Sequence, residues 1–236
     1  MKKMDSPVEP GKVLDEIEKT VYAVLRPIGF RKYGRTLHRY VSGDISQAIT
    51  FQLGQSYRGE THLLFVDIGI RVPECMTRSF IAAESAKKYY QAFECNIRSR
   101  LGAVQGGEIS CYDLRKNTEP IIEDILRQIC DTVLPTWEIM NSRDAILAHR
   151  REFPDFDLLN NHLILLEEAM IHGHRGNLEQ AAETFRTYYR LFANGQLVQK
   201  DPGAIKNHLR YLDTLAEQLQ IQLPEILHTP IAADMI

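Results

Sequence analysis

Four polar side chains in two neighbouring segments could hold a small ligand. Thr50 and Gln52 alternate with the apolar residues of one segment, and Asp67 and Arg71 alternate with those of the next. Because successive side chains of a β-strand point to opposite faces of the sheet, these four should share the face opposite the apolar core. There Asp67 could act as a base or hydrogen-bond acceptor and Arg71 as its anion-binding partner. The competing interpretation is a solvated face that needs no ligand.

A basic and aromatic segment forms a second candidate site. No acidic residue occurs between Glu18 and Asp44, and arginines there alternate with aromatic side chains. On a single strand some of these residues would share one face, which a later strand could extend; the residues are Arg31, Tyr33, Arg35 and Arg39, with Arg98 and Arg100 as the extension. Such a face can hold an anionic ligand or an acidic partner, or stack nucleic-acid bases. The alternative is a solvated face whose arginines form ion pairs within the fold.

Metal binding and catalysis have weaker signals. Glu168 and His172 are four residues apart and could share a metal with His162 or His174. However, His172 falls at a helix-packing position and His174 in an expected turn, so we expect no metal and no cofactor. The phosphate-binding, dinucleotide, zinc-protease and serine-hydrolase motifs are absent from the sequence. We therefore predict no catalytic residues and favour a non-enzymatic protein, while an enzyme remains open.

An antiparallel sheet preceded by a helix should position these residues. The apolar spacing over 12–28 is helical, and two-residue alternation predicts about five strands, at 30–41, 45–55, 61–73, 94–101 and 108–114. From Thr118 onward the apolar period becomes helical. The predicted fold is therefore α+β: an antiparallel sheet of about five strands with an N-terminal helix and flanking helices, followed by a C-terminal α-helical subdomain. Phe153-Pro154-Asp155 suggests a division into residues 1–152 and 153–236, and acidic residues outnumber basic ones only after it.

Several motifs occur in the order found in a known family. They are Leu25–Lys32, Asp44–Gln47 leading to Phe51-Gln52, Phe65–Ile70, and Cys95–Gly102. With them the chain resembles the bacterial family called domain of unknown function 4304, over roughly residues 12–150. The family more often has Asn at the place of Asp67, and its paired-tryptophan segment corresponds here to Ser110–Leu114, without tryptophan. The resemblance implies a bacterial protein and no established activity.

The C-terminal part resembles a single tetratricopeptide-type helix pair centred on Gly176–Ala181. Its packing positions are Leu165, Ala169, Gly176, Ala181, Phe185 and Tyr188. The pattern does not recur 34 residues later, where Gly203 and Arg210 stand at the places of Ala169 and Gly176. A lone pair cannot bury its apolar face, so we expect it to pack with the following helix and against the N-terminal domain, without forming a peptide-binding solenoid.

Composition limits the remaining possibilities. The chain has 236 residues, 44% hydrophobic and 25% charged, with a net charge of −3 that does not favour nucleic acid. It has neither an apolar stretch long enough to span a membrane nor a secretory signal, and its four cysteines are far apart in sequence, so we expect a cytoplasmic protein.

Three hypotheses on function follow from the sequence. The leading one is a non-enzymatic protein-binding or regulatory module with a protein partner of unknown identity and no membrane association. The sequence leaves its oligomeric state open, with a homodimer as one option. The alternative is a small anionic ligand binder or an enzyme that uses the polar sheet face. The third is nucleic-acid binding through the Arg31–Arg39 strand.

Overall fold

The computed structural model describes residues 9–55, 61–77, 89–156, 163–194, 202–218 and 220. The chain divides into two compact units: residues 1–72 with 86–159, and residues 73–85 with 160–236. The division after the sheet unit therefore falls at 159–160, close to the predicted 152–153, and the second unit also takes in residues 73–85.

The first unit is built on one antiparallel sheet. Its strands are β1 Arg31–Tyr33, β2 Thr36–Ser42, β3 Ile45–Gln55, β4 Thr61–Arg71, β5 Ile97–Arg100 and β6 Tyr112–Asp113. Their order is β1-β2-β3-β4-β5, and β6 also pairs with β4. The long β3 and β4 form the centre of the sheet, with Thr50 opposite Asp67 and Leu53 opposite Leu64. The predicted α+β fold with an antiparallel sheet is confirmed.

A tight hairpin interrupts the first predicted strand. Residues 30–41 do not form one strand, because the chain reverses at Gly34-Arg35 between β1 and β2. Gly34 has a φ of +58°, in the left-handed region that glycine adopts without steric cost. The reversal places Tyr33 opposite Thr36 and Arg31 opposite His38.

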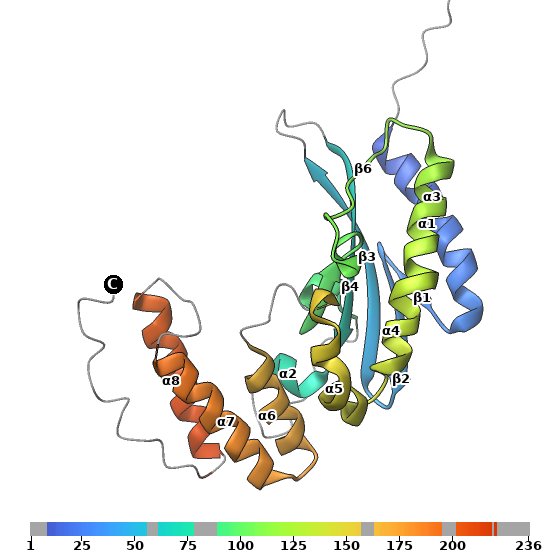
Figure 1. The fold of residues 1–236 in the computed structure, drawn as a ribbon. Helices are drawn as coiled ribbons and strands as arrows, with labels where there is room; N and C mark the ends of the chain where they lie inside the picture. The colour runs from blue at the N-terminus through green and yellow to red at the C-terminus, as the bar shows by residue number, and fades with distance from the viewer. Residues whose placement is uncertain are drawn as a thin grey trace, which may run out of the picture. The chain divides into compact units, whose positions relative to one another are not determined.

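Helices cover one face of this sheet. Helix α1 Pro10–Leu25 lies beside α3 Thr118–Gln128, and α4 Leu134–Ile139 continues α3 (Figure 1). Apolar residues of β3 and β4 that point to this side, and those on the inner faces of the helices, form a buried core; it includes Leu14, Ile17, Val21, Ile49, Phe51, Leu64, Val66, Ile68, Ile70, Ile125, Ile129 and Trp137. Burying such side chains is the main stabilising contribution to the unit, at about 1.5–3 kcal/mol each.

A π-helical turn over Ile129–Val133 joins α3 to α4. The Leu134 N–H donates to the Ile129 carbonyl, one residue further back than in an α-helix. Pro135 follows, and because proline has no N–H it would interrupt a regular helix at this point. The turn keeps the helix continuous across the proline. Helix α5 Arg143–His149 then begins at Ser142, whose hydroxyl accepts the Ala145 N–H.

Residues 89–96, called here the 89–96 segment, cross the other face of the sheet. The segment contains a 3₁₀ helix at Ala92–Glu94. Its Ala92 packs with Ala48 and Cys95 in a buried cluster. The Asn96 side chain accepts the Val72 N–H at 2.7 Å. The segment lies so close to β4 that a Cβ at Gly69 would stand 2.7 Å from the Ala92 carbonyl oxygen.

The second unit is helical. It comprises α2 Pro73–Thr77, α6 Ile164–His174, α7 Leu178–Ala193 and α8 Pro202–Gln218. Helices α6 and α7 pack across a turn at Gly176, and the Tyr188 hydroxyl of α7 lies 2.8 Å from His208 Nε2 of α8. The helix pair thus contacts the helix that follows it, as expected, and its likeness to a tetratricopeptide repeat stays a prediction. None of the helices that the structure describes is long and apolar enough to cross a membrane.

Candidate functional site

Strand register brings the two predicted polar sites onto one face. A row of directly opposite residues crosses five strands; it consists of Tyr33, Thr36, Thr50, Asp67 and Arg100. Opposite residues of antiparallel strands point to the same side, so this row defines the polar face. Gln52 and Arg71 lie on that face by the two-residue alternation of their strands, and Arg31 and Arg98 lie there by pairing with His38 and Gly69.

Arg39 and Arg35 depart from the predicted basic face. Arg39 points to the helix-covered side of the sheet, where its Nε donates to Gln47 at 2.5 Å and its Nη2 to Glu138 at 2.6 Å. Arg35 lies in the hairpin turn, 3.9 Å from a carboxylate oxygen of Asp15 and 3.9 Å from one of Glu18. The expectation that Arg31, Tyr33, Arg35 and Arg39 share one face of a strand is wrong, because the hairpin reverses the chain between them.

Ion pairs and ring contacts close the centre of the polar face. Asp67 is 4% exposed, and its Oδ1 accepts from Arg100 Nε at 2.6 Å. The Arg100 guanidinium also stacks over Phe65, and that of Arg71 lies 3.7 Å from the centre of the Tyr90 ring. These contacts hold Asp67 and Arg71 within the sheet and the 89–96 segment.

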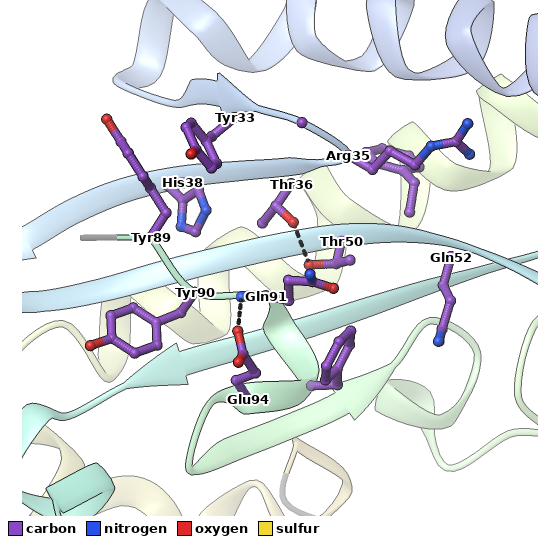
Figure 2. Close-up of a pocket in the computed structure, with 13 residues that line it drawn as sticks. Tyr33, Arg35, Thr36, His38, Thr50, Gln52, Tyr89, Tyr90, Gln91 and Glu94 are labelled. Atoms are coloured by element: carbon purple, nitrogen blue, oxygen red, sulfur yellow. Dashed lines mark hydrogen bonds between the residues drawn. The ribbon is translucent and has the colours of Figure 1, made fainter. Parts of the chain in front are cut away.

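A pocket of about 710 Å³ lies beside this closed region, toward β1 and β2. Its lining comes from the hairpin, from β3 and from the 89–96 segment, and includes Thr50 and Gln52 of the predicted polar site and Tyr33 and Arg35 of the predicted basic site (Figure 2). The volume is within the range of sites for small organic molecules. Asp67, Arg71, Arg31, Arg39, Arg98 and Arg100 are not among the residues that line this pocket.

Two threonine hydroxyls on the sheet, called here the threonine pair, face this pocket. The Oγ1 atoms of Thr36 and Thr50 are 3.0 Å apart, and Thr50 Oγ1 also accepts the Ala92 N–H at 2.8 Å. Both residues are buried. The pair has two hydroxyl protons, of which one forms the bond between them, so one remains for an acceptor in the pocket. Figure 2 shows the pair below the hairpin and above the 89–96 segment.

His38 provides the second uncommitted polar group. It is 6% exposed, and its Nε2 has no hydrogen-bond partner among the residues that the structure describes. Burial lowers the pKa of its imidazole below the ordinary 6.5, so the ring is neutral at pH 7. A buried polar atom without a partner costs about 1–3 kcal/mol, which a ligand atom bonded to it would recover.

Aromatic rings and engaged charges complete the lining. The rings of Tyr33 and Tyr89 stack with centres 3.8 Å apart, and the Tyr89 ring lies 5.8 Å from that of His38. Glu94 Oε2 accepts the Gln91 N–H at 2.9 Å, as Figure 2 shows. Arg35 faces the acids of α1 described above. Both charged groups of the lining therefore contact protein atoms already.

The remaining residues considered are those of the candidate metal site, the segment without tryptophan and the cysteines. His162 is outside the described residues, and no group of three or more metal-ligating side chains occurs among those described. The Tyr112 hydroxyl, in the segment without tryptophan, donates to Asp124 at 2.8 Å and accepts from Gln128. Burial raises the pKa of the Cys95 thiol to about 12, so it stays protonated.

The pocket includes residues that the sequence analysis did not select. One of them is His38, which lies among the aromatic side chains between the arginines and was not selected on its own. Recognising a hairpin turn at Gly34-Arg35 would have placed His38 opposite Arg31. His38 follows Thr36 by two residues, so it would then lie on the same face as Thr50. Tyr89 and Gln91 come from a segment with weak helical character, and no sequence signal places them over the sheet.

Together these features define an α+β domain with one helix-covered sheet face and one face that carries a pocket. The chain belongs to the family described as domain of unknown function (DUF4304), whose profile matches residues 21–139. Comparison with curated proteins and with solved structures finds no significant match in either. The family match contains every residue that lines the pocket and ends before the helices α6 to α8.

Proposed function

We propose that the sheet unit binds a small organic molecule in the pocket between the hairpin, β3 and the 89–96 segment. The observation that carries this proposal is the buried His38 Nε2, which has no hydrogen-bond partner in the described part of the chain, in the lining of a pocket of ligand size beside a threonine pair with a spare proton. In folded proteins buried polar atoms nearly always have a partner, and exceptions call for an explanation. A bound ligand is the explanation we favour.

A ligand screen with the full chain tests this proposal. Polar metabolites are screened by saturation-transfer NMR, and the affinities of the hits are measured by calorimetry. We expect at least one compound to bind, and Thr36→Val to weaken it about tenfold, because the variant removes the hydroxyl that shares a strand and a face with His38, at almost constant volume.

Thr20→Val is the matched control. Its hydroxyl donates to the Glu16 carbonyl on the surface of α1, and Thr20 does not line the pocket. The control should bind the hit like the wild-type chain. The proposal fails if no compound binds at millimolar concentration. It also fails if a folded Thr36→Val protein, checked by circular dichroism, binds as tightly as the wild type.

A protein partner is the second proposal, supported by exposed aromatic side chains on the polar face. Tyr33 is 57% exposed and Tyr40 is 56% exposed, and tyrosine is enriched at protein interfaces. Tyr40 does not line the pocket. Tyr40→Ser should therefore weaken a protein complex while leaving small-molecule binding unchanged.

Two further expectations remain proposals. Nucleic-acid binding has the weakest support, since the predicted arginine face is divided by the hairpin. A cytoplasmic location is supported by the four cysteines, none of which forms a disulfide in the structure.

A further inference from the structure

We infer that the ligand of this pocket is an uncharged planar ring with an amide-type edge, whose carbonyl accepts from the threonine pair and whose N–H donates to His38 Nε2. This inference rests on the proposed function and specifies its ligand class. Nucleobases with a ring amide, such as uracil, and ring carboxamides share this edge, and the experiment below separates them.

The charges of the lining favour an uncharged ligand. The described residues of the lining include one guanidinium and one carboxylate, from Arg35 and Glu94, and the imidazole of His38 is neutral at pH 7. Glu94 accepts the Gln91 N–H, and Arg35 faces Asp15 and Glu18 of α1. An ionic ligand would lose hydration on entering and would meet no uncommitted opposite charge among these groups, which is costly.

The hydrogen-bonding groups favour an edge with one acceptor and one donor. The threonine pair offers a proton to an acceptor on the ligand, and His38 Nε2 accepts an N–H in the tautomer that carries the ring proton on Nδ1. His38 follows Thr36 by two positions on β2 and points to the same face, which places the two Cα atoms about 7 Å apart. With hydrogen bonds of about 2.8–3.0 Å on each side, a carbonyl and an adjacent N–H fit between the two groups.

The rings of the lining favour a planar ligand. Tyr33 and Tyr89 are nearly parallel, with an interplanar angle of 14°, and together with His38 they form an aromatic wall on this side of the pocket. A flat ring can stack on or abut such a wall, whereas a branched aliphatic molecule matches it less well.

Three probes of similar size test the inference with the full chain. Nicotinamide carries the amide edge, methyl nicotinate carries only the carbonyl acceptor, and nicotinate carries a negative charge. We expect nicotinamide to bind at least about tenfold more tightly than either of the others in calorimetry or NMR titration. Uracil and hypoxanthine, two nucleobases with a ring amide, form a second arm, and tighter binding of these than of nicotinamide would identify a nucleobase site.

Variants assign each contact separately. His38→Leu should abolish the preference for nicotinamide over the methyl ester, because the N–H is the group that the ester lacks. Thr36→Val should weaken the amide and the ester by the same factor, because both have the carbonyl. Should His38→Leu fail to fold, the Thr36→Val result on the two probes still tests the carbonyl contact, and the three-probe ranking tests the ligand class.

The outcomes distinguish this inference from the proposed function. If screened compounds bind and respond to Thr36→Val, but nicotinate or the methyl ester equals or exceeds nicotinamide and the nucleobases, the inference is wrong and the pocket remains a ligand site. If neither the library nor these probes bind, both are wrong.

Discussion

The two faces of the sheet are covered in different ways. On the apolar face α1, α3 and α4 pack against β3 and β4, and the central side chains there are fully buried. On the polar face a short segment, residues 89–96, is held by contacts such as the Ala92 N–H to Thr50 bond, and a pocket remains beside it. Broad apolar packing thus stabilises the domain, while the narrow polar cover leaves groups available for recognition.

Contacts on the apolar face also stabilise the fold more than contacts on the polar face do. Each buried aliphatic side chain of the apolar face stabilises the fold by roughly 1.5–3 kcal/mol. The ion pair between Asp67 and Arg100 contributes less, because a third of the Arg100 side chain is exposed and solvent screens the attraction. Substitutions on the apolar face should therefore act mainly on stability, and those on the polar face mainly on binding.

The largest expected effect is on the apolar face, at Ile68. This residue is buried at the centre of β4. Ile68→Ala removes three side-chain carbons and leaves a cavity, so we expect a loss of about 2–5 kcal/mol in the free energy of unfolding. Urea denaturation followed by fluorescence measures it.

The control for this prediction is Val24→Ala on α1, at a side chain 45% exposed. Its effect should stay within about 0.5 kcal/mol. A loss below about 1 kcal/mol for Ile68→Ala would mean that the apolar face does not form the tightly packed core described here.

An intermediate effect is expected where the 89–96 segment touches the sheet. A Cβ at Gly69 would stand 2.6 Å from Cys95 Cβ and 2.7 Å from the Ala92 carbonyl oxygen. Gly69→Ala therefore has to displace the segment, and we expect a loss of about 1–3 kcal/mol in the free energy of unfolding. The displacement should also shift the NMR resonances of His38, because Tyr89 of the same segment contacts its ring.

Gly11→Ala provides the matched control for the segment. A Cβ at Gly11 would meet no heavy atom within 4 Å, and the residue lies in the first turn of α1. The control should leave stability and the His38 resonances unchanged or stabilise slightly. If Gly69→Ala changes stability and the His38 resonances no more than Gly11→Ala does, the 89–96 segment is not packed closely against β4. The side of the pocket that this segment forms would then not be rigid.

The sequence predicted the central sheet because the signal there is local. The alternation of Leu64, Val66, Ile68 and Ile70 determines which face of β4 is buried, and no distant residue changes it. The hairpin at Gly34 was missed because a two-residue turn with a single glycine interrupts the alternation only slightly. The sequence therefore predicted a single strand where the structure has β1 and β2.

The candidate site was predicted only in part because its geometry depends on residues far apart in the chain. Asp67 forms its ion pair with Arg100, 33 positions later, and Thr50 meets the Ala92 N–H 42 positions later. Periodicity placed Thr50 and Gln52 on the polar face. It could not show that Arg100 would engage Asp67, or that the 89–96 segment would lie against Arg71 and leave Thr50 beside a pocket.

The smallest expected effect is the contribution of His38 to the pH dependence of the free energy of unfolding. It directly measures whether water reaches this part of the polar face. Burial lowers the pKa of its folded-state imidazole below the unfolded value near 6.5. Below pH 6.5 the unfolded chain therefore binds a proton that the folded chain does not yet bind, so the stability contributed at this position falls as the pH drops toward the folded pKa. Well above pH 6.5 the imidazole is neutral in both the folded and the unfolded state, and its contribution to stability is constant.

Comparison of the wild type with His38→Leu isolates this contribution, since the other histidines titrate alike in both proteins. We expect the difference in free energy of unfolding, wild type minus variant, to be constant above pH 7.5 and to decrease steadily from pH 6.5 to pH 5. An increase over that range would mean that the folded state stabilises the protonated imidazole. His38 would then be paired with an acid, whereas a difference that stays constant down to pH 5 would mean that the ring is solvated. Either result would contradict a pocket that keeps water away from His38.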